Sequence, residues 1–122
     1  MDNPNVQAKD YPPVQITNST PYNAWGRVHF RSAFCRDDDY HVTTGTTWTG
    51  PGRGVCLVTR ITATVKTPKG DIVATPYESS GTSFSRFAII QTGPDSFQVT
   101  RIVNALEDQT PEGYVEPATQ QN

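Results

Sequence analysis

The sequence has little of what builds helices. Leu, Met and Ala are scarce, and no stretch spaces apolar residues three and four apart without an intruding Pro, Gly or β-branched run. Thr, Ser, Val, Gly and Pro dominate instead, with ten prolines and nine glycines among 122 residues. Strands favour β-branched residues, while Gly and Pro supply turns. The composition therefore predicts an all-β domain.

Long apolar runs are absent as well. No segment approaches the length that spans a bilayer, so a membrane-spanning protein is not expected. Residues 1–5 contain neither the basic nor the apolar region of a signal peptide. A length of 122 residues favours one domain, large enough for a sandwich or small barrel and too small for two cores.

Charge is sparse and unevenly distributed. Residues 13–104 carry nine Lys and Arg against six Asp and Glu, whereas residues 105–122 carry four acidic residues and no basic one. The mildly basic segment 13–104 is compatible with an anionic partner. Its excess of basic over acidic residues is far below that of nucleic-acid-binding domains, so no nucleic acid is expected. We predict a flexible N-terminal segment at 1–12, a β-sandwich domain at 13–104 and an acidic flexible tail at 105–122.

Alternation with a period of two sets the strands and their faces. Residues 55–66 are predicted as one long strand with Val55, Leu57 and Ile61 toward the core. Residues 87–90 are apolar on both faces, which suggests a central strand or an intersubunit contact. About eight strands result, in an antiparallel β-sandwich that is jelly-roll-like or Ig-like. The expected strands are 14–18, 24–35, 40–42, 46–49, 55–66, 72–77, 84–91 and 97–103, with a polar loop at 79–83.

The predicted strand 24–35 carries the most unusual side chains. Its even positions, which include Phe34, are mostly apolar or small and should face the core. Its odd positions place an aromatic ring, two cations and an imidazole on the outer face. Trp can stack on a sugar or sit at a lipid interface, and Arg binds carboxylate, sulfate or phosphate. The candidate ligand-binding residues are Trp25, Arg27, His29 and Arg31, extended by Tyr40 and Trp48 in nearby loops.

An equally acceptable reading is that another strand, a second subunit or the acidic tail covers this row. In that case Trp25 packs against its cover and contacts no ligand.

Catalysis and metal binding have little support. The chain has two histidines and few carboxylates, and nothing resembles a nucleophile elbow or a Gly-rich phosphate loop. Asp37, Asp38 and Asp39 offer oxygen ligands suited to Ca²⁺, but neighbours in a strand point in opposite directions and the spacing of a calcium loop is missing. We expect a solvated turn here, and no enzyme, cofactor or metal.

Two cysteines, Cys35 and Cys56, permit one disulfide. Each ends a predicted strand, where pairing across the sandwich is possible. A bridge would stabilise the fold by roughly 3 kcal/mol in the chain-entropy model. Two buried reduced thiols are an equal alternative, so the compartment is open. Extracellular localisation is slightly favoured if the bridge forms.

The segment Ile16-Thr17-Asn18, with Pro21-Tyr22 and Trp25 after it, resembles the opening of thaumatin-like proteins. The chain lacks the many cysteines of that family, so no function is carried over. Asn18-Ser19-Thr20 also fits the N-glycosylation sequon, which matters only for a secreted chain.

Two functions follow as hypotheses. The first is a non-enzymatic binding module, lectin-like or toxin-like, that recognises a glycan or an anionic lipid head group. The alternative is a structural or assembly protein that forms homo-oligomeric or capsid-like contacts, suggested by the apolar strand at 87–90.

Overall fold

The computed structural model describes residues 11–103, so the predicted acidic tail and most of the N-terminal segment lie outside the described residues. The described part contains strands and no helix, which confirms the all-β prediction. Its ten strands are β1 Gln15–Asn18, β2 Ala24–Phe30, β3 Asp38–Val42, β4 Thr47–Thr49, β5 Val58–Ile61, β6 Thr64–Thr67, β7 Gly70–Val73, β8 Tyr77–Thr82, β9 Arg86–Gly93 and β10 Ser96–Arg101.

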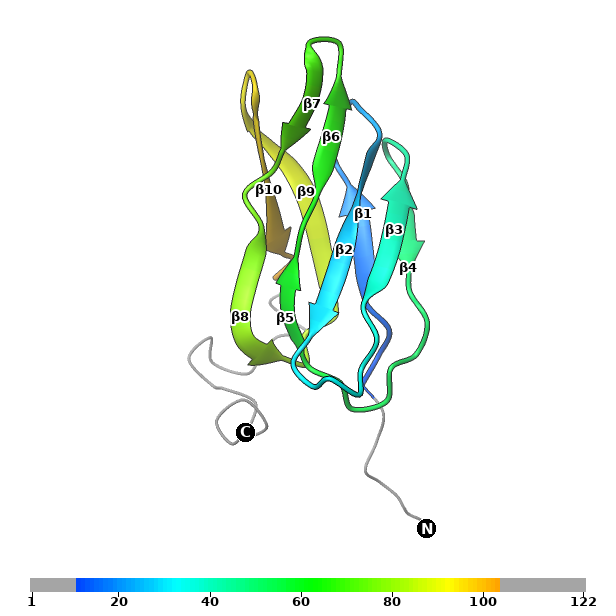
Figure 1. Cartoon of the computed structure of the whole chain (residues 1–122). Coiled ribbons are helices and arrows are strands. Elements are labelled where there is room, and N and C mark those ends of the chain that lie inside the picture. The colour runs from blue at the N-terminus through cyan, green and yellow to red at the C-terminus, as the bar shows by residue number, and fades with distance from the viewer. Residues whose placement is uncertain (1–10, 104–122) are drawn as a thin grey trace.

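The strands form two sheets packed face to face as a β-sandwich (Figure 1). The smaller sheet has the order β10-β9-β1-β4, and the larger has the order β7-β6-β2-β5-β8, with β3 on the other edge of β2. The pairings between these strands are antiparallel except that of β1 with β9, which is parallel, and Thr75 adds a single parallel bridge to Gln98 of β10. At one corner the sheets meet through Thr75, which donates its N–H to Phe97 and accepts one from Val99.

The predicted long strand 55–66 is broken into β5 and β6 at Thr62 and Ala63. The cause is a close approach to β2, where a Cβ on Gly26 would lie 1.9 Å from the Thr62 carbonyl oxygen. That carbonyl accepts a hydrogen bond of 2.5 Å from the buried Tyr40 hydroxyl instead of a ladder partner. β7 and β8 are separated at residues 74–76, beside this break, where Ala74 donates its N–H to the Ala63 carbonyl. The predicted strand 72–77 corresponds to the end of β7 and the start of β8, and the remainder of β8 was not predicted.

Alternation holds in β2 but ends with it. Phe30 is buried, whereas Phe34 is 97% exposed in the following loop, so its predicted core position is wrong. Val55 is also exposed, at 59%, because β5 begins only at Val58. Leu57 and Val58 are both buried next to a register shift between β2 and β5. The largest fully buried apolar side chains are Phe87, Ile16, Ile61, Ile89, Val28, Val65 and Val99.

The predicted polar loop 79–83 is mostly strand. Residues 77–82 form β8, which pairs with β5 at the edge of the larger sheet. The Ser79 hydroxyl donates to the carbonyl of Val58, so a small polar residue is satisfied within the ladder. β9, which contains the two-faced run 87–90, lies between β10 and β1. Phe87 and Ile89 are fully buried on its core face, whereas Ala88 is buried and Ile90 is half-buried on the other face.

A buried asparagine organises one corner of the sandwich. Asn18 is fully buried, and its amide donates to the carbonyls of Tyr22 and Val42 at 2.7 and 3.1 Å. Its side-chain oxygen accepts from the backbone N–H and the hydroxyl of Thr20 at 3.0 and 2.8 Å. The turn between β1 and β2 is thereby attached to the end of β3.

We expect Asn18→Ala to lower the free energy of unfolding by about 3 kcal/mol, because it leaves several buried backbone groups without partners. Urea denaturation should show a lower midpoint with an unchanged slope. The control is Asn23→Ala, which removes one exposed hydrogen bond to the Thr44 N–H and should cost less than about 1 kcal/mol. Equal losses in the two variants would contradict this role for Asn18.

Candidate functional site

The structure places three of the predicted residues on the outer face of the larger sheet. Trp25 and His29 are half-buried, and Arg27 between them is exposed. Trp25 lies opposite His41 on β3 and Thr64 on β6. Arg31 lies beyond the end of β2, where its exposed side chain belongs to a loop and not to the row.

Carboxylates contact both Arg27 and His29 of this row. The Arg27 guanidinium contacts Asp39 through Nε at 2.6 Å and through a second nitrogen at 3.3 Å. Nδ1 of His29 lies 3.0 Å from the Asp37 carboxylate, which is also 3.9 Å from Arg27. The hydrogen bond from Arg27 holds the pKa of Asp39 below its ordinary value. An external anion would therefore have to compete with carboxylates that already occupy these donors.

Tyr40 and Trp48 do not extend the row. Tyr40 lies in β3 with its side chain toward the core and only 4% exposed, and burial raises the pKa of its phenol. Trp48 lies in β4 of the other sheet and packs against the same core. Their rings contact each other with centroids 5.4 Å apart. The two rings contact each other between the sheets, on the core face of the larger sheet, whereas Arg27 lies on its outer face.

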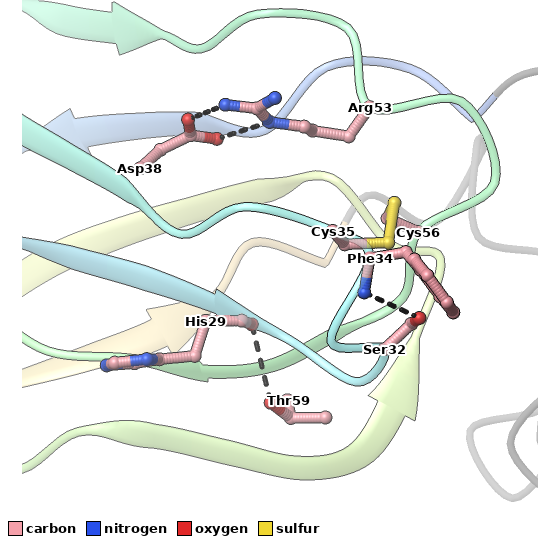
Figure 2. The surroundings of a disulfide bond; sticks show 8 residues. All are labelled: His29, Ser32, Phe34, Cys35, Asp38, Arg53, Cys56 and Thr59. Carbon is pink, nitrogen blue, oxygen red and sulfur yellow. Dashed lines mark hydrogen bonds and ion pairs between the residues drawn. A yellow bond between two sulfur atoms is a disulfide. The ribbon is translucent and has the colours of Figure 1, made fainter.

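Of the two alternatives that the sequence leaves open, the structure contains the disulfide between Cys35 and Cys56, with Cα atoms 6.0 Å apart (Figure 2). It links the loop after β2 to the loop before β5. Next to it, both Nε and a terminal nitrogen of Arg53 donate to the carboxylate of Asp38, at the start of β3. These two groups are mostly buried, with 26% and 11% of their side chains exposed. A covalent bond and a two-point ion pair thus fix the two loops together.

We call residues 31–36 and 53–56 the disulfide tip. Phe34 and Val55, the two large apolar residues exposed there, directly precede the bridged cysteines. Figure 2 shows the Phe34 ring projecting from the loop beside the disulfide. The Phe34 N–H donates to the Ser32 hydroxyl at 3.1 Å, and the Cys35 N–H donates to the Ser32 carbonyl at 2.9 Å. This small hydrogen-bonded turn, together with the bridge, holds the ring outside the core.

The charge of the disulfide tip is basic. Arg31 and Arg36 are exposed on the loop that carries Phe34. The three aspartates that follow contact other residues: Asp38 contacts Arg53, Asp39 contacts Arg27, and Asp37 contacts His29. Sequence reasoning missed Phe34 because it follows the alternation of β2. The polar and small residues 31–33 before it were the signal that the strand had already ended.

Within residues 11–103, no group of three or more His, Cys, Asp or Glu residues is placed to hold a metal ion. The same range contains no helix long and apolar enough to cross a membrane. Comparisons with protein-family models, with curated proteins and with solved structures find no match. The function must therefore be inferred from the geometry of this chain.

The Arg27 contact makes a prediction about pH. The Asp39 carboxyl should titrate below its ordinary pKa of 3.8, and Arg27→Gln should return that pKa toward this value. Because the pKa is lowered, the contact is complete above pH 3.8 and is lost as the pH falls through the lowered value. Carboxyl-detected NMR titration measures the Asp39 pKa in the wild type and in Arg27→Gln. Arg60→Gln, which removes the partner of Glu78, should leave Asp39 unchanged; no response to Arg27→Gln would refute the coupling.

Removing the disulfide tests whether it stabilises the fold and orders the loop at residues 31–37. Cys35→Ala/Cys56→Ala should lower the free energy of unfolding by about 3 kcal/mol, because the bridge closes a loop with a sequence separation of 21. Amide hydrogen exchange should accelerate in residues 31–37 far more than in β9. A reducing agent should reproduce both effects in the wild type and change nothing in the variant. Unaltered exchange in the loop would show that the bridge does not order it.

Proposed function

We propose that the protein is a non-enzymatic binding module that attaches reversibly to anionic lipid surfaces through the disulfide tip. The observation that carries the proposal is Phe34, a large aromatic side chain that is 97% exposed on a loop closed by a disulfide. Exposing such a ring in water has no structural benefit. Peripheral proteins bury aromatic and aliphatic side chains at the boundary of head groups and acyl chains, with cations beside them.

The disulfide tip supplies both kinds of contact. Phe34 and Val55 can enter the lipid boundary together, since the bridge holds their loops at one end of the sandwich. Arg36, exposed on the same loop as Phe34, then lies at the level of the head groups. Burying the Phe34 side chain contributes about 2 kcal/mol and burying Val55 about 1.5 kcal/mol, and Arg36 near an anionic surface adds about 1 kcal/mol. The total of about 4–5 kcal/mol corresponds to a dissociation constant on the order of 1 mM or slightly below.

The outer row of β2 supports the disulfide tip in this proposal. Asp37 follows the loop that carries Phe34, and its contacts with His29 and Arg27 attach the base of that loop to the sheet. Anion recognition by Arg27 itself is disfavoured because Asp39 occupies its guanidinium. The disulfide also agrees with an oxidising compartment such as the extracellular space, which is part of the same proposal.

Co-sedimentation with vesicles tests the assignment. We expect binding to vesicles of mixed phosphatidylcholine and phosphatidylserine, weaker binding at high salt, and little binding to pure phosphatidylcholine. Phe34→Ser should weaken binding about tenfold or more, from the loss of roughly 2 kcal/mol of burial. Arg36→Gln should weaken it about fivefold.

The matched control is Val73→Ser, which removes an apolar side chain of 74% exposure on β7, in the half of the sheet away from the disulfide tip. It should bind lipid like the wild type. Equal binding by the wild type and Phe34→Ser would exclude the disulfide tip as the lipid contact. Light scattering at high protein concentration tests the assembly alternative. If Phe34→Ser abolishes self-association and does not change vesicle binding, Phe34 belongs to a homo-oligomeric contact.

A further inference from the structure

A second candidate site lies at the end of the sandwich opposite the disulfide. Two hairpins project there, β6–β7 from the larger sheet and β9–β10 from the smaller one (Figure 1). A cavity of about 150 Å³ lies between their turns and is lined by Tyr22, Thr67, Pro68, Lys69, Pro94 and Asp95. Pockets for drug-sized ligands measure roughly 300–1,000 Å³, so this cavity suits a single small ring.

The aromatic wall of the cavity is held rigidly. The Tyr22 ring packs edge-on against Phe97 of the core, with centroids 6.2 Å apart. Its backbone carbonyl accepts hydrogen bonds from the buried Asn18 amide and from the Thr20 hydroxyl, at 2.7 and 2.9 Å. The ring therefore presents a fixed surface between the two turns. Pro68 and Pro94 add stiff apolar surface on either side.

The polar groups of the cavity form one opposed pair. Lys69 Nζ lies 3.5 Å from the Asp95 carboxylate, and both side chains are largely exposed. Exposed pairs of this kind contribute little to stability, so a ligand can share or replace the contact at small cost. The hydroxyl of Thr67 is already used, since it donates to the Gly70 carbonyl and accepts from the Lys69 N–H. The cavity therefore offers a carboxylate, an ammonium and an aromatic ring, with no net charge.

We propose that this cavity binds a neutral sugar residue, as a site separate from the disulfide tip. Adjacent hydroxyls of a sugar can donate to Asp95 and accept from Lys69 while the two side chains stay in contact. The apolar C–H face of the sugar packs on the aromatic ring of Tyr22, which is an amphipathic side chain. A simple anion or cation would meet one favourable and one unfavourable charge. A zwitterion would have to separate Lys69 from Asp95.

NMR titration of ¹⁵N-labelled full-length protein tests the site with glucose, galactose, mannose and N-acetylglucosamine. At least one sugar should give saturable shifts at Tyr22, residues 67–69 and Asp95, with a dissociation constant on the order of millimolar for so small and open a cavity. Asp95→Asn should weaken this binding roughly tenfold, because a charge-assisted hydrogen bond becomes a neutral one. Lys69→Met should act similarly, and neither exposed substitution should affect folding.

Two controls make the outcome specific. Asp71→Asn changes an acid on the same β6–β7 hairpin that does not line the cavity, and it should leave sugar binding unaltered. Phe34→Ser should also leave it unaltered, so failure of lipid binding and failure of sugar binding are separate results. The site is refuted by the absence of saturable shifts with every sugar, by an unchanged dissociation constant in Asp95→Asn, or by a stronger response to glycine than to any sugar.

Discussion

The close contact between β2 and the segment joining β5 to β6 determines how the rest of the larger sheet is built. Gly26 leaves space for the Thr62 backbone, and the Tyr40 hydroxyl donates a hydrogen bond to the Thr62 carbonyl, which has no partner in the strand ladder. Because the strand breaks at this point, β5 pairs with β8 and β6 pairs with β7. The lower half of the sheet thus leads to the disulfide tip, and the upper half ends in the hairpin that borders the Tyr22 cavity (Figure 1).

The two proposed sites use different means of holding exposed residues in place. At the disulfide tip, Cys35–Cys56 and Asp38–Arg53 fix two loops that have no strand ladder of their own. At the other end, the hairpin turns depend on their ladders, and Tyr22 depends on the Asn18 hydrogen bonds. The outer row of β2 lies between these ends, where Arg27 is paired with Asp39 and His29 contacts Asp37. An aromatic and cationic row in a sequence can therefore be part of the scaffold.

Period-two alternation predicted the all-β sandwich, the faces of β2 and the hairpin β9–β10, because these features depend on local patterns of burial. It failed where tertiary contacts decide. Nothing local marks the break at Thr62, which depends on a glycine 36 residues earlier. Tyr40 was predicted to extend the ligand-binding row, yet the pairing of β3 with β2 places its side chain in the core. Phe34 continued an apolar alternation past the end of its strand, and its exposure depends on a bridge whose formation the spacing allowed but did not decide.

The Asn18 corner has a consequence for producing the protein in cells that attach N-linked glycans. The sequon at 18–20 is intact, but both amide hydrogens of Asn18 are donated within the fold and the side chain has no exposed surface. An oligosaccharyltransferase could reach this nitrogen only before β1 and β3 come together. A glycan attached there would occupy the space of the Tyr22 and Val42 carbonyls and keep the corner open. In such cells the glycosylated fraction would depend on the relative rates of folding and glycosylation, and the native protein would be the unglycosylated fraction.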